Sequence, residues 1–281
     1  MALPSKLGIV AGGGTLPEKL LEFCDSRNIE TFTIGFENQT DPRILEGRAH
    51  MMTRIGAAGS IIKILKDKSY QDLVLIGSIR RPHLSEMRPD LYTAAFFAKL
   101  GLRALGDDNL LKAVHGALAQ EGFTLHGIHE LMQDLLMPEG ILGRAKPSKA
   151  HQADIDAGFG IAKAIGALDI GQSIVIQDGI VLGVEGVEGT DELIRRCAEY
   201  RRTRDGGILV KTCKPEQDRK IDMPTIGPQT IALCASLGYS GVAVEAASAL
   251  MVDMQQSIQM ADESKLFLIG VRAPARQAAD E

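Results

Sequence analysis

The sequence is marked first by what it lacks. It contains no tryptophan, and aromatic residues make up only 4% of the chain. No apolar run approaches the roughly 20 residues with which a helix crosses a bilayer. The four cysteines are widely spaced and form no CxxC pair, which argues against a structural zinc site and against a disulfide framework. We therefore expect a protein of the reducing cytoplasm without a membrane-spanning helix.

The chain also lacks an excess of positive charge. It has 31 lysines and arginines against 36 aspartates and glutamates, which gives a formal net charge of −5. This balance offers no general electrostatic attraction for a nucleic acid, so we expect no nucleic-acid partner. With 281 residues, 45% of them hydrophobic, the chain is long enough for two domains of ordinary size.

The first half alternates between strand and helix patterns. Short apolar runs at residues 7–11, 30–35 and 72–77 predict buried strands. Patterns near residues 17–27 and 59–68 predict helices between them. Strands joined by helices form parallel sheets covered on both faces. Residues 1–135 are therefore predicted to form a Rossmann-like α/β domain with a parallel sheet.

The pattern changes after this domain. Residues 136–150 contain "LMPEGILGRAKP", in which prolines and glycines interrupt the periodicity, and we interpret this segment as a linker. Further on, "SIVIQDGIVLGVE" places Asp178-Gly179 between two β-rich runs, which predicts a hairpin with a two-residue type I′ turn. Residues 151–281 are predicted to form a second α/β domain that includes this hairpin and a charged catalytic loop.

A glycine cluster, "AGGGTLP", follows the first predicted strand. Gly12 and Gly14 match the first two glycines of a dinucleotide-binding fingerprint, but Pro17 stands where the third glycine should be. An NAD-dependent dehydrogenase is therefore disfavoured. Two alternatives stay open for the loop, namely close approach to a ligand at a helix N-terminus and a tight strand-to-helix turn.

A loop rich in both charges lies in the second half, "LVKTCKPEQDRKIDMPTIGPQT". Lys211 and Lys214 are suited to bind phosphate oxygens, while Asp218 and Asp222 are suited to a hard cation such as Mg²⁺. A solvated charged loop without a ligand is the alternative.

One more acidic stretch, "VEGVEGTDELIRR", precedes a predicted helix. Thr190 is a suitable N-cap for that helix. Glu185 and Glu188 lie among glycines just upstream and have no equally obvious structural role. His115 is expected on the surface or edge of a helix.

Four motifs together resemble a known family. "AGGGTLP", "GDDNLL", "LDIGQSIVIQDGIVLGVEGVEGTDELIRR" and "GILVKTCKPEQDRKIDMPTIGPQT" occur in the order found in the UDP-2,3-diacylglucosamine pyrophosphatases of lipid A biosynthesis. The resemblance runs from about Leu7 to Val271. It implies two domains and a lipid-linked UDP-sugar substrate. The implied reaction is hydrolysis to 2,3-diacylglucosamine 1-phosphate (lipid X) and UMP, with Mg²⁺ as cofactor and water attack on the β-phosphorus.

Under this reading Asp222 and Asp218 are the expected catalytic residues and metal ligands. The residues expected to bind substrate come from both halves of the sequence: Gly12, Gly13, Leu16, Ser78, Ile79, Gln172, Thr190, Lys211 and Lys214.

The alternative function is a non-catalytic nucleotide-binding or lipid-carrier protein with a Rossmann-like domain. It would need the glycine loop but no paired aspartates and no metal. Under either reading we expect a cytoplasmic protein. Peripheral contact with the inner membrane surface and association as a homodimer both stay open.

Overall fold

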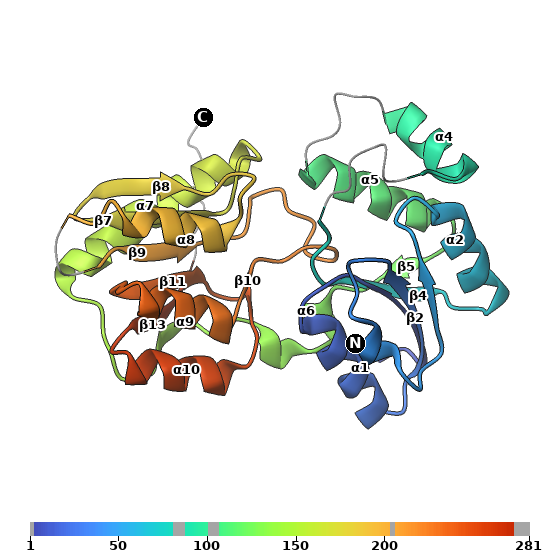
Figure 1. Ribbon diagram of the computed structural model, residues 1–281, viewed down its shortest axis with the longest axis horizontal. Coiled ribbons are helices and arrows are strands. Elements are labelled where there is room, and N and C mark those ends of the chain that lie inside the picture. Colours follow the sequence, from blue (N-terminus) through green and yellow to red (C-terminus); the bar gives the residue numbers. More distant parts are fainter. Residues whose placement is uncertain (1–2, 81–87, 101–106, 203–205, 273–281) are drawn as a thin grey trace, which may run out of the picture. The chain divides into compact units, whose positions relative to one another are not determined.

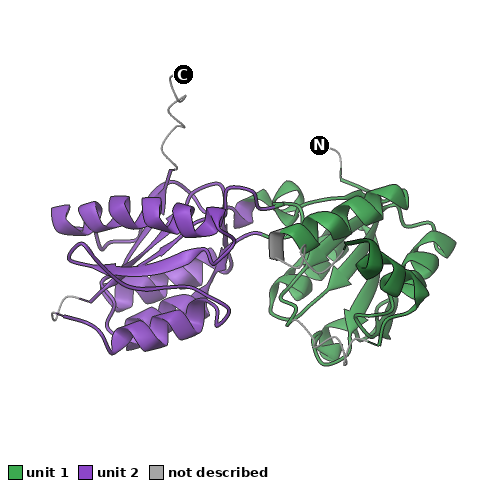
Figure 2. Ribbon diagram, turned by 90° about the horizontal axis from the view of Figure 1, so that it is seen from above, with its two compact units in different colours: residues 1–133, 218–222 green, residues 134–217, 223–281 purple. Residues whose placement is uncertain are grey.

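The structure is a computed structural model that describes residues 3–80, 88–100, 107–202 and 206–272. The chain divides into two compact units (Figure 2). Unit 1 comprises Met1–Gln133 together with Asp218–Asp222, and unit 2 comprises Asp134–Gln217 together with Met223–Glu281. No described helix is both long and apolar enough to traverse a bilayer.

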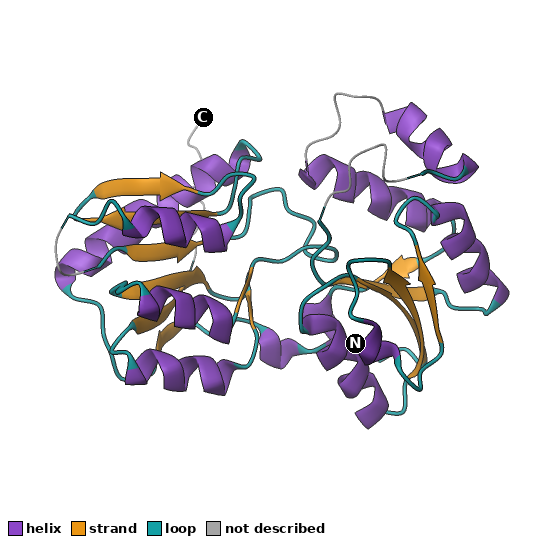
Figure 3. Ribbon diagram, viewed as in Figure 1, coloured by secondary structure: helices purple, strands orange, loops and turns teal. Residues whose placement is uncertain are grey.

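Unit 1 is built on a sheet of five parallel strands in the order β3-β2-β1-β4-β5 (Figure 3). The strands are β1 (Lys6–Ala11), β2 (Glu30–Phe36), β3 (His50–Thr53), β4 (Asp72–Ile76) and β5 (Thr124–Leu125). The helices are α1 (Leu16–Ser26), α2 (Ala58–Asp67), α4 (Leu91–Leu100), α5 (Asp107–Gln120) and α6 (Ile128–Leu131), with the 3₁₀ turn η1 (Pro42–Leu45).

The strand order fixes where a ligand can reach this sheet. The chain leaves β1 towards β2 and β3 and then returns to β4 on the other side of β1, so the order reverses between β1 and β4. Right-handed crossovers then place α1 on one face and α2 on the other, as Figure 1 shows. Ligands of open α/β sheets bind outside the carboxyl ends of the two strands at such a switch point. The loops after β1 and β4 occupy that position.

Unit 2 contains a mixed six-stranded sheet in the order β6-β13-β11-β9-β7-β8. Its strands are β6 (Gly140–Leu142), β7 (Ser173–Gln177), β8 (Ile180–Val184), β9 (Ile208–Lys211), β11 (Gly241–Glu245) and β13 (Phe267–Val271). A separate two-stranded sheet pairs β10 (Thr225–Ile226) with β12 (Leu250–Met251). The helices are α7 (Lys149–Ala167), α8 (Thr190–Ala198), α9 (Pro228–Ser236) and α10 (Met254–Glu263), and the 3₁₀ turn η3 spans Gln133–Leu135.

Alternating side chains divide the core of unit 2 into two layers. Leu209 of β9 packs with α8, α9 and α10, whereas its neighbours Ile208 and Val210 pack with α7 on the opposite face. Figure 1 shows the same division, with α7 behind the sheet and the other three helices in front of it. Since successive side chains of a strand point to opposite faces, Lys211 shares the face of Leu209. This places Lys211 beneath α8, at the carboxyl end of β9.

The expectation of two α/β units, the first with a parallel sheet, is confirmed. The predicted hairpin is confirmed as well, because β7 and β8 are antiparallel and joined by Asp178 (φ 52°) and Gly179 (φ 76°), both with the positive φ of a type I′ turn. Within the segment interpreted as a linker, β6 pairs antiparallel with β13 and so joins the sheet of unit 2.

A buried carboxylate on α7 supports the hairpin turn. Asp154 accepts hydrogen bonds from the backbone N–H groups of Asp178 (2.8 Å) and Gly179 (2.7 Å). We expect Asp154→Ala to lower the free energy of unfolding by about 1–2 kcal/mol, because two charge-assisted hydrogen bonds are lost. Urea unfolding would measure the change. The matched control is Asp156→Ala on the exposed side of the same helix. Its carboxylate accepts a hydrogen bond from Gln152, and its loss should change stability by less than about 0.5 kcal/mol. Equal losses in the two variants would contradict the assigned role of Asp154.

Candidate functional site

Lys211 is the central charged group at the carboxyl edge of the sheet in unit 2. Its side chain is 5% exposed, and its Nζ donates a hydrogen bond to Thr190 Oγ1 at 2.7 Å. Among the described residues no carboxylate forms an ion pair with this ammonium group. A buried cation that lacks a direct counter-charge is costly for the fold, and such groups are common where a protein binds an anion.

The N-terminus of α8 lies beside Lys211. The sequence predicted Thr190 as the N-cap, but the structure places Gly189 there with φ 81° and Thr190 as the first helical residue. That prediction is wrong because the chain enters the helix through a left-handed conformation that glycine adopts without strain. Since no side chain in the described part of the chain caps this helix, its first N–H groups remain available to an anion.

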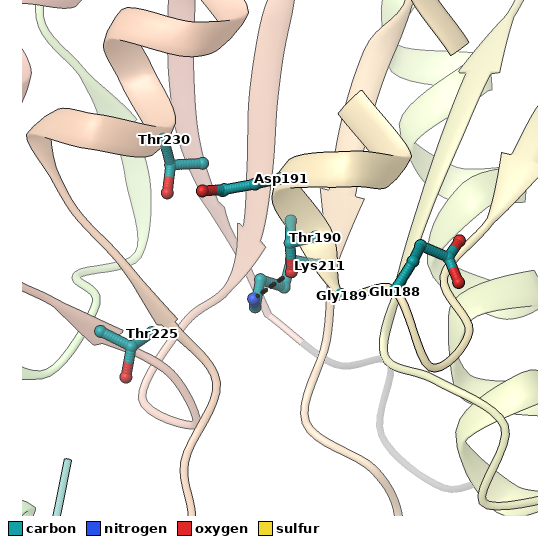
Figure 4. A pocket seen from close by; sticks show the side chains of 7 residues that line it. All are labelled: Glu188, Gly189, Thr190, Asp191, Lys211, Thr225 and Thr230. Carbon is teal, nitrogen blue, oxygen red and sulfur yellow. Dashed lines mark hydrogen bonds between the residues drawn. The ribbon is translucent and has the colours of Figure 1, made fainter. Parts of the chain in front are cut away.

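These groups open into a cavity of about 330 Å³ (Figure 4). Thr230, in the first turn of α9, and Asp191, at the start of α8, point toward one another, and the Lys211–Thr190 hydrogen bond lies below them in that view. The cavity is lined by Glu188, Gly189, Thr190, Asp191, Lys211, Thr225 and Thr230. Hydroxyl groups, helix N–H groups and one ammonium group together suit a phosphate attached to a polar sugar.

The two acidic residues that the sequence left unexplained both have partners. Glu188 binds Arg196 of α8 at 2.8 Å, and a hydrogen bond from its own backbone N–H together with this guanidinium holds the pKa of the carboxyl below its usual value. Glu185 is 6% exposed and accepts a hydrogen bond from Thr190 Oγ1 at 2.8 Å. Glu185 is thus linked to Lys211 through the hydroxyl group of Thr190.

Gln172 and Lys214 lie at the same edge of the sheet in different surroundings. The backbone N–H of Gln172 donates to Glu185 Oε2, and the side-chain Oε1 of Gln172 is buried without a hydrogen-bond partner. Lys214 Nζ forms an ion pair with Asp169 at 2.6 Å. Because that charge is already balanced, Lys211 is the better suited of the two lysines to attract a phosphate. Substrate contact by Gln172 and Lys214 stays a prediction.

The glycine loop of unit 1 packs against the loop after β4. Gly12 N donates to Ile76 O at 2.8 Å, and Gly13 and Ser78 exchange two backbone hydrogen bonds. A Cβ on Gly12 would lie 2.4 Å from the carbonyl oxygen of Ser78, so only glycine allows this approach. The tight contact between the two loops therefore accounts for Gly12 whether or not a ligand binds there. The N–H groups of Gly12 and Gly13 are occupied by protein carbonyls.

The remaining predicted residues of unit 1 lie at the same switch point. Leu16 is the first residue of α1 and is half-buried, and Ile79 directly follows Ser78 and is 45% exposed. The structure thus brings Gly12, Gly13 and Ser78 into direct contact. Binding of a nucleotide by these residues stays a prediction.

The two predicted catalytic aspartates lie in the segment Asp218–Asp222, which belongs to unit 1. Asp222 N donates to the carbonyl oxygen of Asp218 at 2.9 Å, so the two residues lie one turn apart. Lys220 fixes the segment by donating from Nζ to the carbonyl oxygen of Leu125 at 3.0 Å. Contacts with the N-terminal half of the chain therefore hold the segment, although its sequence lies in the C-terminal half.

His115 of α5 is a partner that the sequence reasoning missed. Its Nδ1 lies 2.5 Å from Asp218 Oδ2, and its side chain is 31% exposed. The prediction that it lies at the surface or edge of a helix fits this exposure but gives no hint of the contact. The two residues are 103 positions apart, so no local spacing could have indicated it.

Another histidine, His129, follows nearby in the chain at α6. Burial lowers the pKa of His129, and the neighbouring Arg219 lowers it further. A neutral imidazole of His129 is therefore favoured beside Arg219 and Lys220.

Asp218 and Asp222 offer carboxylate oxygens, the ligand type that a hard divalent cation prefers. No group of three or more histidine, cysteine, aspartate or glutamate side chains gathers in the described ranges. Mg²⁺ commonly takes only one or two carboxylates from a protein and completes its octahedron with water and substrate phosphates. Asp218 and Asp222, one turn apart, fit that demand. The described residues do not supply the larger ligand set that a closed site made only of protein ligands would need.

Comparison with known proteins gives matches along both units. Family models described as the LpxI N-terminal domain and the LpxI C-terminal domain match residues 6–135 and 138–269. The chain is 37% identical over 273 residues to a protein named UDP-2,3-diacylglucosamine pyrophosphatase LpxI from Caulobacter vibrioides, which covers 95% of this chain and 97% of that relative. The solved structure of CobK precorrin-6A reductase covers 98% of this chain and 90% of its own, with 12% identity and a TM-score of 0.34, a likeness too weak to inform fold or function.

Proposed function

The chain belongs to the LpxI family, and on this premise we propose that it is a UDP-2,3-diacylglucosamine pyrophosphatase of lipid A biosynthesis. The reaction converts UDP-2,3-diacylglucosamine and water into 2,3-diacylglucosamine 1-phosphate (lipid X) and UMP. The single observation that best supports this proposal within the molecule is the buried ammonium of Lys211, which lines a cavity beside the uncapped N-terminus of α8.

Lys211 and Thr190 are proposed to bind phosphate oxygens of the substrate. The ammonium group attracts the negative charge, and the helix N–H groups supply directed donors. These donors are already in place before the reaction, so they can stabilise charge that develops in the transition state without rearrangement. In unit 1, Gly13, Leu16, Ser78 and Ile79 at the switch point are proposed to contact the nucleotide.

Asp218 and Asp222 are proposed to hold a divalent cation, Mg²⁺ by the family resemblance. When bound, such a cation would neutralise charge on the diphosphate and lower the pKa of water. His115 holds Asp218 Oδ2 and so restricts the direction in which that carboxylate can face. Asp222 is held in turn through its backbone bond to Asp218.

Metal dependence separates this enzyme from a non-catalytic binding protein. Purified protein is incubated with UDP-2,3-diacylglucosamine and Mg²⁺, and UMP release is followed with and without EDTA. We expect UMP to form only without EDTA and formation to resume when excess Mg²⁺ is added. UMP release that is unaffected by EDTA would contradict the proposed requirement for a divalent cation. No UMP under any condition would favour the binding protein.

The bond that breaks can be identified with labelled water. We propose that water attacks the β-phosphorus, that a new P–O bond forms there, and that UMP leaves with the bridging oxygen. Hydrolysis in ¹⁸O-labelled water should therefore place the label on the lipid phosphate, as mass spectrometry would show. Label recovered in UMP would mean attack at the α-phosphorus.

A lipid-linked substrate also suggests where the enzyme works. We propose a cytoplasmic protein that contacts the inner membrane surface peripherally. Flotation with vesicles would test this contact. A homodimer stays a prediction that light scattering after gel filtration would test.

A further inference from the structure

Glu185 is a buried carboxylate that the proposed function has not used. It follows β8 directly, and its side chain accepts two hydrogen bonds, from Thr190 Oγ1 at 2.8 Å and from the backbone N–H of Gln172 at 3.2 Å. The backbone N–H of Glu185 in turn donates to Ser173 O at 2.8 Å. Both carboxylate oxygens and the backbone are thus engaged, so the position of this residue is well defined.

The order of donors and acceptors fixes the direction of the chain Glu185–Thr190–Lys211. A carboxylate can only accept and an ammonium can only donate. Thr190 therefore gives its one hydroxyl proton to Glu185 and accepts from Lys211 Nζ at 2.7 Å. Ser173 Oγ lies 3.5 Å from Thr190 Oγ1, too far to compete strongly for either role.

In this arrangement Glu185 offsets the positive charge of Lys211 without forming a direct ion pair with its ammonium group. A carboxylate in direct contact would neutralise the ammonium, as Asp169 does for Lys214. The hydroxyl of Thr190 separates the carboxylate from the ammonium group. Within the described residues, the other N–H bonds of Lys211 remain available to the cavity that it lines.

We infer that Glu185 is a positioning residue: it orients Thr190, and through Thr190 it holds Lys211 for an incoming phosphate group. The identity of that group as part of a lipid-linked UDP-sugar rests on the proposed function, but the positioning role does not. Glutamine cannot replace Glu185 fully, because its amide has one accepting oxygen where two donors must be received.

A double-mutant cycle on phosphate binding tests this role without any assay of activity. The affinity for inorganic phosphate is measured by ³¹P NMR titration for the wild type, Glu185→Gln, Thr190→Val and the double variant, with circular dichroism as the check on folding. We expect each single variant to weaken binding about 10-fold, the size expected for one strong hydrogen bond, and the double variant to be no weaker than the singles. Thr190→Ser, which keeps the hydroxyl, should bind nearly as the wild type does.

Glu245→Gln is the matched control. Glu245 is also buried at the end of a strand, but it binds Lys163 and the backbone N–H of Cys213, and neither Thr190 nor Lys211. Its effect on phosphate affinity, of whatever size, should multiply with that of Thr190→Val.

Three results would overturn the inference: no phosphate binding by the wild type, effects of Glu185→Gln and Thr190→Val that multiply, or unchanged affinity in Glu185→Gln. If Glu185→Gln does not fold, the comparison of Thr190→Val with Thr190→Ser decides, because equal affinities would exclude the hydroxyl. A wild type that binds phosphate with the expected coupling but releases no UMP would refute the proposed function and leave the positioning role standing.

Discussion

Replacing Lys211 with methionine is expected to lower kcat/KM by about 10²–10³-fold and to weaken phosphate binding in parallel. Methionine fills nearly the same space in the buried site, but it offers neither the charge nor the N–H donors that now reach Thr190 and the cavity. Arginine should not restore activity, because its longer planar fork cannot occupy the position of a compact ammonium group. Steady-state kinetics together with phosphate titration would measure both effects.

Lys163→Met separates loss of function from loss of stability. Lys163 pairs directly with the buried carboxylate of Glu245 at 2.6 Å, so its removal leaves that charge uncompensated and should lower the free energy of unfolding by about 3–5 kcal/mol. We expect Lys211→Met to be the more damaging variant for phosphate binding and Lys163→Met the more damaging for stability. The reverse order would remove Lys211 from the proposed phosphate site.

Replacing Asp222 with asparagine is expected to reduce turnover by about 10²-fold or more, with a comparable loss in Asp218→Asn. An amide cannot supply the negative charge that a hard cation requires, yet it is close in size to the carboxylate, so the segment should keep its fold. For Asp222→Asn we expect substrate binding to persist, so that kcat falls far more than the affinity. Turnover and equilibrium binding of the substrate would be measured on the same preparations.

Asp67→Asn is the control for these variants. Asp67 is an exposed aspartate at the end of α2 in the same unit, and its substitution should leave turnover unchanged. Near-wild-type turnover in Asp222→Asn would remove that residue from the mechanism. A lower kcat in Asp67→Asn would show that the assay responds to changes of surface charge in general.

Much of the architecture could be predicted from local patterns. The apolar run at residues 72–77 became β4, and the Asp178-Gly179 pair became the expected type I′ turn, because both depend on neighbouring residues only. The short strand β6 was missed, since its pairing with β13 joins residues far apart in the chain. Helix α10 begins only at Met254, because Leu250 and Met251 pair with β10 in a separate small sheet.

The candidate site was predictable in residue types and less so in geometry. The sequence singled out Lys211 and Thr190, and alternation along β9 explains why Lys211 lies beneath α8, where it contacts Thr190 at the start of that helix. The support from Glu185 and the contact of His115 with Asp218 depend on tertiary packing, for which no spacing rule exists. Gly12 is the opposite case. The glycine cluster suggested a ligand-binding loop, but a close contact between two loops already explains why residue 12 is glycine.

The products formed from UDP-2,3-diacylglucosamine by the wild-type protein with Mg²⁺ test the central claim most directly. Mass spectrometry of one reaction identifies which bond has been cut. The account predicts UMP and 2,3-diacylglucosamine 1-phosphate in equal amounts. UDP together with 2,3-diacylglucosamine would show cleavage at the sugar instead of the diphosphate, and either that result or unchanged substrate would contradict the account.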